Sequence, residues 1–96
     1  MADVRYTERA LAHLERLTEF LTGTDPDAAA DTAKIVVDAI EVLHRHPEIG
    51  RPGEGDFREL IISRGRTGYV ALYSYDERDD TVVVHAIRHQ REAGYA

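Results

Sequence analysis

The order of apolar patterns along this 96-residue chain constrains its fold more than any other feature. A short extended segment opens the chain, two stretches with helical spacing follow, and three extended segments close it. Because the helical stretches form one block and most extended segments another, the order predicts an α+β domain with a meander sheet rather than a doubly wound fold. A chain of this length predicts one domain, spanning residues 1–96.

Two amphipathic helices are predicted in the first half of the chain. Leucine and alanine recur at three- and four-residue intervals over residues 8–22, and Thr7 is placed to cap the N-terminus of this helix. The second helix begins at Asp25, which can cap it, and ends before Pro47, because the residue before a proline disfavours helical geometry. The apolar seams predict that the two helices pack as an antiparallel hairpin.

Four extended segments complete the predicted order β-α-α-β-β-β. The first covers residues 3–6 and stands alone before the helices. The others cover residues 57–63, 69–75 and 81–88, and a glycine-rich turn and a charged turn join them. Since short turns join antiparallel neighbours, these three segments predict an antiparallel meander.

The segment 69–75 is apolar on both of its faces. Tyrosine and alanine occupy one face, and Val70 and Leu72 lie on the other. A helical hairpin covers one face of a single sheet, so we expect Val70 and Leu72 to be exposed on the opposite face. An exposed apolar stripe is typical of a partner surface, which is the interpretation we favour. The alternative is that the C-terminal tail folds back over this face.

Charge and cysteine content narrow the classes of function. The net charge is −6, and the part up to Glu48 carries five basic and ten acidic residues. Strong nucleic-acid binders usually carry a basic surplus, so this chain is better suited to a basic protein partner. Cysteine is absent, and we predict no metal and no cofactor. Neither a signal peptide nor a membrane-spanning run is evident, so we expect a cytoplasmic protein without membrane contact.

Four short motifs stand at the ends and in the centres of the predicted elements. They are His46-Pro47-Glu48-Ile49-Gly50, Phe57-Arg58-Glu59-Leu60, Gly68-Tyr69-Val70-Ala71-Leu72-Tyr73 and Ala86-Ile87-Arg88-His89-Gln90-Arg91. In this order and at these spacings they resemble the RelE/ParE superfamily of type II toxin–antitoxin toxins, over nearly the whole chain. The resemblance implies a small sheet cradling a helical hairpin, and an antitoxin protein that wraps the toxin.

The resemblance implies one of two activities. RelE-like toxins cut mRNA in the ribosomal A site, whereas ParE-like toxins poison DNA gyrase and lack the RNase residues. Metal-free RNA cleavage needs cations on the scissile phosphate and groups that transfer protons. The question is therefore whether this chain keeps those groups.

The positions that RelE-like toxins use for RNA cleavage are partly replaced in this chain. Arg58 matches one basic position, but Leu60 and Val70 stand where the family places cations, and His89 stands where an arginine is expected. A valine cannot stabilise a pentacovalent phosphate. An RNase built on this chain would depend on Arg58, His89, Arg91 and Tyr95.

These replacements favour a ParE-like toxin of the plasmid-stabilisation type, which inhibits DNA gyrase and is neutralised by its cognate antitoxin. The alternatives are a RelE-like ribosome-dependent mRNA endonuclease and a non-toxic remnant that only binds antitoxin. No catalytic residue is assigned under the favoured interpretation. The expected target-binding residues are Arg64, Arg66, His89 and Arg91. The expected antitoxin-binding residues are Leu11, Val70 and Leu72.

Overall fold

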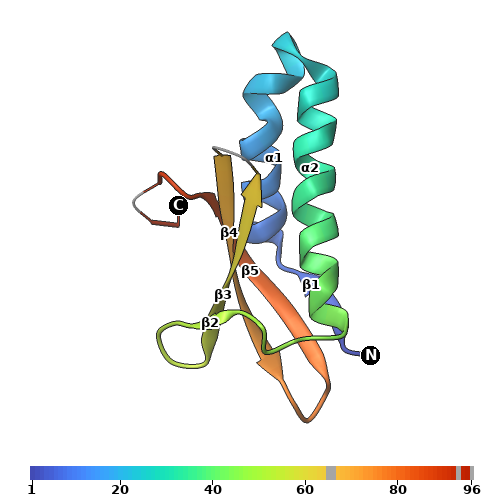
Figure 1. The fold of residues 1–96 in the computed structure, drawn as a ribbon, viewed down its shortest axis with the longest axis vertical. Coiled ribbons are helices and arrows are strands. Elements are labelled where there is room, and N and C mark those ends of the chain that lie inside the picture. Colours follow the sequence, from blue (N-terminus) through green and yellow to red (C-terminus); the bar gives the residue numbers. More distant parts are fainter. Residues whose placement is uncertain (65–66, 93, 96) are drawn as a thin grey trace.

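The protein has two layers, a five-stranded sheet and a helical hairpin that lies against one of its faces (Figure 1). The computed structural model describes residues 1–64, 67–92 and 94–95, and at 20–24, 63, 64 and 67 it describes the backbone alone. The sheet face toward the helices is the inner face, and the opposite one is the outer face. No helix within this described part is long and apolar enough to cross a membrane.

The sheet is mixed, with the strand order β1-β5-β4-β3-β2. Strands β3 (Phe57–Arg64), β4 (Thr67–Asp76) and β5 (Thr81–His89) form the antiparallel meander. Strand β1 (Asp3–Tyr6) lies parallel to β5, on the edge of the meander. Strand β2 (Arg51–Pro52) pairs with the first part of β3 at the other edge.

The hairpin consists of α1 (Glu8–Thr24) and α2 (Pro26–Ile40), which lie side by side in Figure 1. A short 3-10 helix, η1 (Glu41–His44), follows α2 and leads toward the sheet. Both α-helices are amphipathic, because their apolar residues recur at helical spacing. The hairpin therefore presents one apolar side to the inner face.

Side chains cap the N-termini of both helices. The hydroxyl of Thr7 accepts a hydrogen bond from the backbone N–H of Ala10, at 3.0 Å. The carboxylate of Asp25 accepts one from Ala28, at 3.1 Å, and Pro26 occupies the first helical position. Each cap satisfies a backbone donor that has no partner within its helix, so each helix begins where the sequence predicts.

The core lies between the hairpin and the inner face. Val36 and Ile40 of α2 and Leu43 of η1 are fully buried, and each contributes about 1.5–3 kcal/mol of hydrophobic stabilisation. Tyr73 of β4 is also fully buried. Its hydroxyl accepts a hydrogen bond from the backbone N–H of Gly50, at 2.8 Å, so the one polar group of this side chain has a partner inside the core.

Helix α1 closes the edge of β5 beyond the end of β1. The backbone N–H of Thr7 donates to the carbonyl of Val84, at 3.0 Å, and the Thr7 hydroxyl donates to the carbonyl of His85, at 3.2 Å. The backbone N–H of Ile87 then donates to Nδ1 of the buried His13, at 3.1 Å. These bonds satisfy an edge that would otherwise be open to pairing with another chain.

The predicted fold class and the element order are confirmed. Helix α1 continues to Thr24, two residues beyond the range 8–22 predicted for it. The parallel pairing of β1 with β5 and the two-residue β2 are additions that the sequence did not predict. Both are long-range features, and no local pattern specifies them.

Candidate functional site

The C-terminal segment folds back over the outer face of the sheet. The hydroxyl of Tyr95 donates to the carboxylate of Glu59 on β3, at 2.7 Å. The guanidinium carbon of Arg88 on β5 lies 5.2 Å from the centroid of the Tyr95 ring, which is a cation–π contact. Glu59 stands opposite Leu72 of β4, and Arg88 stands opposite Val70. Tyr95 therefore reaches from β5 to β3 across this part of β4.

The expected exposure of Val70 is wrong. Val70 is 2% exposed and Leu72 is half-buried. The C-terminal tail covers this face, as the alternative interpretation of the sequence held. Tyr95 and the aliphatic part of Arg88 lie over Val70 and Leu72. Ile61, opposite Val70 on β3, remains 42% exposed. The apolar surface of the outer face is thus smaller than the sequence suggests.

Polar contacts hold the tail in this position. The tail curls around the guanidinium group of Arg88, whose Nη1 donates hydrogen bonds to backbone carbonyls of the tail. This nitrogen donates to the carbonyls of His89 and Gln90, at 3.2 Å each, and of Glu92, at 2.9 Å. The Glu92 carboxylate accepts a bond from the His89 N–H, at 3.1 Å, and pairs with Arg16 of α1 at 2.9 Å. The tail is therefore fixed to both β5 and α1.

The Tyr95–Glu59 pair has shifted pKa values. Burial, together with the adjacent Glu59 carboxylate, raises the pKa of Tyr95 to about 12. The hydrogen bond from Tyr95, and then Arg51 at 3.0 Å, hold the pKa of Glu59 below its ordinary value of 4.5. At neutral pH Tyr95 is thus a neutral donor to a charged acceptor. A phenol held in its protonated form is not suited to act as a general base.

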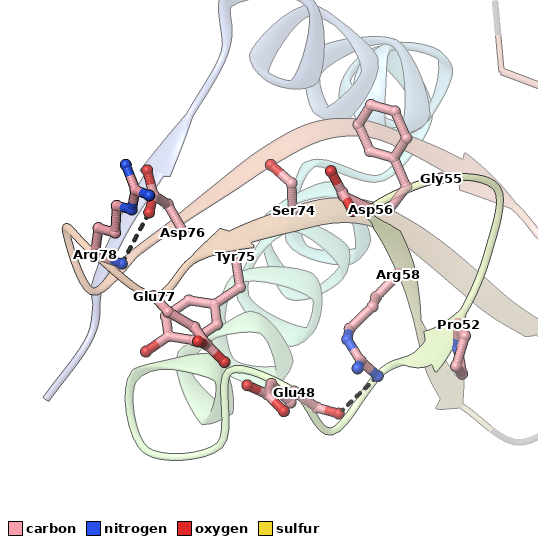
Figure 2. Close-up of a pocket in the computed structure, with 11 residues that line it drawn as sticks. Glu48, Pro52, Gly55, Asp56, Arg58, Ser74, Tyr75, Asp76, Glu77 and Arg78 are labelled. Carbon is pink, nitrogen blue, oxygen red and sulfur yellow. Dashed lines mark hydrogen bonds between the residues drawn. The ribbon is translucent and has the colours of Figure 1, made fainter.

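Arg58 lies on the inner side of β3, opposite Tyr73. Its Nη1 donates to the carbonyl of Glu48, at 3.1 Å, and to that of Gly50, at 2.9 Å. Figure 2 shows the first of these bonds joining β3 to the loop before β2. The guanidinium therefore holds the loop that carries Gly50 against the core.

His89 lies near the end of β5 beside Tyr69. The two rings meet edge to face, with their centroids 5.5 Å apart. Nδ1 of His89 accepts a hydrogen bond from the backbone N–H of Arg91, at 3.1 Å, so the ring helps to turn the chain away from the sheet. His89 is half-buried, and Arg91 is exposed.

Of the four residues in the RNase hypothesis, His89 and Arg91 are in contact, but Arg58 and Tyr95 lie apart from them and from each other. The register partners of Arg58 and His89 on β4 are Tyr73 and Tyr69, which are four residues, or about 13 Å, apart along the strand. Tyr95 lies on the opposite, outer face of the sheet. These three groups therefore do not converge on a single phosphate.

The remaining predicted residues have different settings. Leu11 is 52% exposed on α1, so it is accessible to a partner. The Arg64 side chain and the whole of Arg66 lie outside the described part of the chain. Of the four predicted target-binding side chains, the structure therefore places His89 and Arg91.

A groove of about 700 Å³ lies at the end of the sheet, between the β4–β5 hairpin and the loops that flank β2. In Figure 2 its side chains come from the loop that carries Glu48, from the β4–β5 hairpin and from the segment between Pro52 and Arg58. Tyr75, Phe57 and Pro52 contribute apolar surface. The sequence did not single out this groove. Its four carboxylates are those of Glu48, Asp56, Asp76 and Glu77.

The sequence did not predict a role for three residues that hold the tail, namely Glu59, Arg88 and Glu92. A signal for the first two was available. Glu59 and Arg88 are charged residues at outward positions of otherwise apolar strands, and a charge in such a place usually has a partner. Which residue would be that partner could not be predicted, since Tyr95 is 36 residues from Glu59.

Known proteins of similar sequence and structure identify the family of this chain. Residues 4–94 match the family model of the ParE toxin of the type II toxin–antitoxin system, parDE. Over 92 residues the chain is 34% identical to Toxin RelE3 of Caulobacter vibrioides, which covers 96% of this chain and 98% of that protein.

Two solved structures share the fold over nearly the whole chain. The chromosomal ParDE toxin–antitoxin system from P. aeruginosa gives a TM-score of 0.72 at 20% identity, covering 91% of this chain and 94% of that chain. The toxin–antitoxin complex RelBE2 from Mycobacterium tuberculosis gives 0.61 at 25% identity, covering 95% and 93%. Because the family model spans nearly every residue, this chain belongs to the ParE toxin family of type II toxin–antitoxin systems, within the RelE/ParE superfamily.

Proposed function

We propose that this toxin inhibits DNA gyrase in the cytoplasm and does not cut RNA. It acts as one domain that binds a macromolecular target, and a cognate antitoxin neutralises it. Arg91 and His89, at the end of β5, are the described members of the target-binding set, to which Arg64 and Arg66 belong by sequence. Arg91 is exposed, so its charge is available for contact with the target.

The observation that carries this proposal is that the residues described by the structure form no cationic centre for RNA cleavage. Leu60 and Val70 occupy two positions where RelE-like toxins place cations, and Val70 is buried. Arg58 is engaged with loop carbonyls, and Tyr95 is held protonated on the other face. Removing one such stabilising group typically costs about 3–4 kcal/mol in the transition state, so a site that has lost two would be severely impaired.

We place the antitoxin on α1 and on the outer face. The exposed Leu11 offers an apolar contact for an amphipathic helix or an extended segment of the antitoxin. Leu72 is half-buried and Val70 is buried beneath the tail, so an antitoxin that contacts them has to displace Tyr95. The structures that share this fold come from toxin–antitoxin systems, which supports an antitoxin partner for this chain.

The second candidate is a ribosome-dependent mRNA endonuclease. The observation in its favour is the name of the relative at 34% identity, Toxin RelE3. Such an enzyme would use Arg58, His89, Arg91 and Tyr95. In a translating extract, Arg58→Ala and Tyr95→Phe would then abolish mRNA cleavage by the purified chain.

A DNA supercoiling assay with purified gyrase tests the proposal. We expect the chain to block supercoiling and to leave linear DNA. A translating extract that receives the same preparation should keep its mRNA intact. Unaffected gyrase together with cleaved mRNA would replace the proposal with the second candidate.

A further inference from the structure

We infer that the groove at the end of the sheet binds a cationic, partly apolar segment of the antitoxin, in which lysine or arginine side chains flank an aliphatic one. The inference deepens the proposed function, because it rests on the existence of an antitoxin partner and names the chemistry of the segment that docks. The groove is distinct from the Leu11 surface on α1 and from the covered outer face.

The shape of the groove suits a peptide segment better than a single small ion. Its volume is about 700 Å³, and a second hollow of about 430 Å³ adjoins it. Both hollows are lined by Glu48 and Tyr75, so these two residues form a shared wall, and we call the two neighbouring hollows together the trough. A trough of this size accommodates several consecutive residues of an extended chain.

Each of the two hollows has an exposed apolar side chain in its lining. Ile49, in the second hollow, is 57% exposed, and Phe57, in the first, is 39% exposed. Tyr75 lines both hollows, and Pro47 lines the second one. Exposed aliphatic and aromatic groups beside charged ones are typical of protein interfaces, and they favour a ligand with an apolar side chain of its own.

The charge of the trough selects a cationic ligand. Within the described part of the chain, no hydrogen bond or ion pair engages the carboxylates of Glu48, Asp56 and Glu77. Two arginines also line the first hollow, namely Arg78 and Arg58, and the Nη1 of Arg58 is bound to loop carbonyls. Two positive charges against four carboxylates leave this hollow with a formal charge of −2. With a net charge of −6, the whole molecule adds to the attraction for a basic segment and repels phosphate.

Tyr75 lies close to the carboxylates of Glu48 and Glu77, and also to Asp80 outside the trough. Its hydroxyl donates to Asp80 at 2.7 Å, and this bond is the first cause that raises the pKa of Tyr75 to about 12. Partial burial adds to the shift, and so do the charges of Glu77 and Glu48. The Glu48 and Glu77 charges are therefore both felt at Tyr75, although the hydrogen bond to Asp80 is the larger cause of its shift.

The test uses the full chain and a synthetic twelve-residue peptide of alternating lysine and leucine. A twin with glutamine in place of each lysine is the matched control. In nuclear magnetic resonance titrations we expect the lysine peptide to shift the amides of Ile49, Phe57, Tyr75 and Glu77. We expect binding to weaken strongly as salt is raised, and the glutamine twin to leave these amides unchanged.

Two charge-matched variants localise the binding. Asp56→Asn combined with Glu77→Gln should weaken binding of the lysine peptide roughly fivefold or more, since each removes one ion pair. Glu15→Gln combined with Glu19→Gln removes the same charge from the exposed side of α1 and should leave affinity nearly unchanged. Equal weakening by both pairs, shifts confined to α1, or binding of the glutamine twin would overturn the inference.

The same variants separate this inference from the proposed function. In co-expression with the product of the adjacent reading frame, wild-type chain should form a salt-resistant complex, and the Asp56→Asn/Glu77→Gln variant should lose that complex at lower salt. If wild type forms no complex while the lysine peptide still maps to the trough, the proposed antitoxin partnership fails, and the trough is a site for cationic segments whose partner is not this antitoxin. If wild type and the Asp56→Asn/Glu77→Gln variant form complexes of equal salt resistance, and the peptide shifts amides elsewhere, the groove is not the docking site. The antitoxin partnership would then still hold.

Discussion

Tyr95 links three strands at the scale of single residues. Its hydroxyl donates to Glu59 of β3, and its ring lies against Arg88 of β5. Tyr95 and Arg88 together cover Val70 of β4, which lies between these two strands. A bond to a charged acceptor in a half-buried site is worth more than one at the surface. The tail is therefore a part of the folded domain with a measurable share in its stability.

Tyr95→Phe removes the hydroxyl and keeps the ring over Arg88. We expect it to lower the free energy of unfolding by about 1–2 kcal/mol, because Glu59 loses a hydrogen bond while the cation–π contact remains. Urea denaturation measures the change as a shift of the midpoint. Tyr95→Ala should cost more, since it also uncovers Val70. Equal stability of wild type and Tyr95→Phe would show that the Tyr95–Glu59 hydrogen bond does not stabilise the fold.

The shifted pKa values of this pair predict how stability depends on pH. The pKa of Glu59 is lowered on folding, so the unfolded state binds more protons and stability falls as pH drops below about 4.5. The pKa of Tyr95 is raised to about 12, so its contribution is complete below about pH 10 and is lost as pH rises toward 12. Unfolding temperatures across this range should show both decreases.

The matched control for that profile is Tyr95→Phe. Because the first cause of the Glu59 shift is the hydrogen bond from Tyr95, the variant should lose less stability between pH 5 and 3 than wild type loses. Parallel acid limbs for the two proteins would contradict the assignment of this bond.

At the scale of elements, the loop before β2 is fixed by a close approach to the core. Gly50 donates its N–H to the hydroxyl of the buried Tyr73, and Arg58 holds the Gly50 carbonyl. A Cβ atom at Gly50 would lie 2.6 Å from Cε1 and from the hydroxyl of Tyr73, and 2.9 Å from the Glu59 carbonyl. Neither the buried ring nor the paired backbone can move away easily, so only glycine fits.

Gly50→Ala should lower the free energy of unfolding by about 2–3 kcal/mol, which is the cost of overpacking a core contact. Gly94→Ala is the control, because nothing lies within 4 Å of a Cβ atom at Gly94. Chemical denaturation of both variants gives the comparison. A neutral Gly50→Ala would mean that the loop is not held against Tyr73 as described.

The elements differ in how far the sequence predicts them. Thr7 and Asp25 start their helices with local capping bonds, so composition and spacing sufficed to find both. The pairing of β1 with β5 joins residues about 78 positions apart, such as Asp3 and Thr81, and no local signal encodes it. The prediction that Val70 is exposed was wrong for the same reason. Strand alternation indicates which face of the sheet a residue occupies, but not which distant segment covers that face.

At the scale of the whole molecule, the candidate surfaces are separate. Leu11 is exposed on α1, Arg91 is exposed beyond β5, and the acidic trough lies at the end of the sheet where the β4–β5 hairpin turns. An antitoxin that wraps the toxin can therefore engage several of these surfaces at once, which raises the affinity of the complex through effective concentration.

Leu11→Glu should weaken the complex with the antitoxin at least roughly fivefold, because a charge replaces an apolar contact, and should change the stability of the free chain by less than about 0.5 kcal/mol. Ala30→Glu introduces the same charge at an exposed position of α2 and should leave binding unchanged. Titration calorimetry with the antitoxin decides the matter. Equal affinities of the two variants would remove Leu11 from the interface.

The central claim is that this toxin acts on gyrase and not on mRNA. The most direct measurement is supercoiling of relaxed plasmid by purified gyrase, with and without the purified chain, with Arg91→Ala as a partial-loss variant. We predict that wild type blocks supercoiling and produces linear DNA, and that Arg91→Ala does so less effectively. Full supercoiling in the presence of excess wild-type chain, with cleavage of mRNA in a translating extract, would contradict the account.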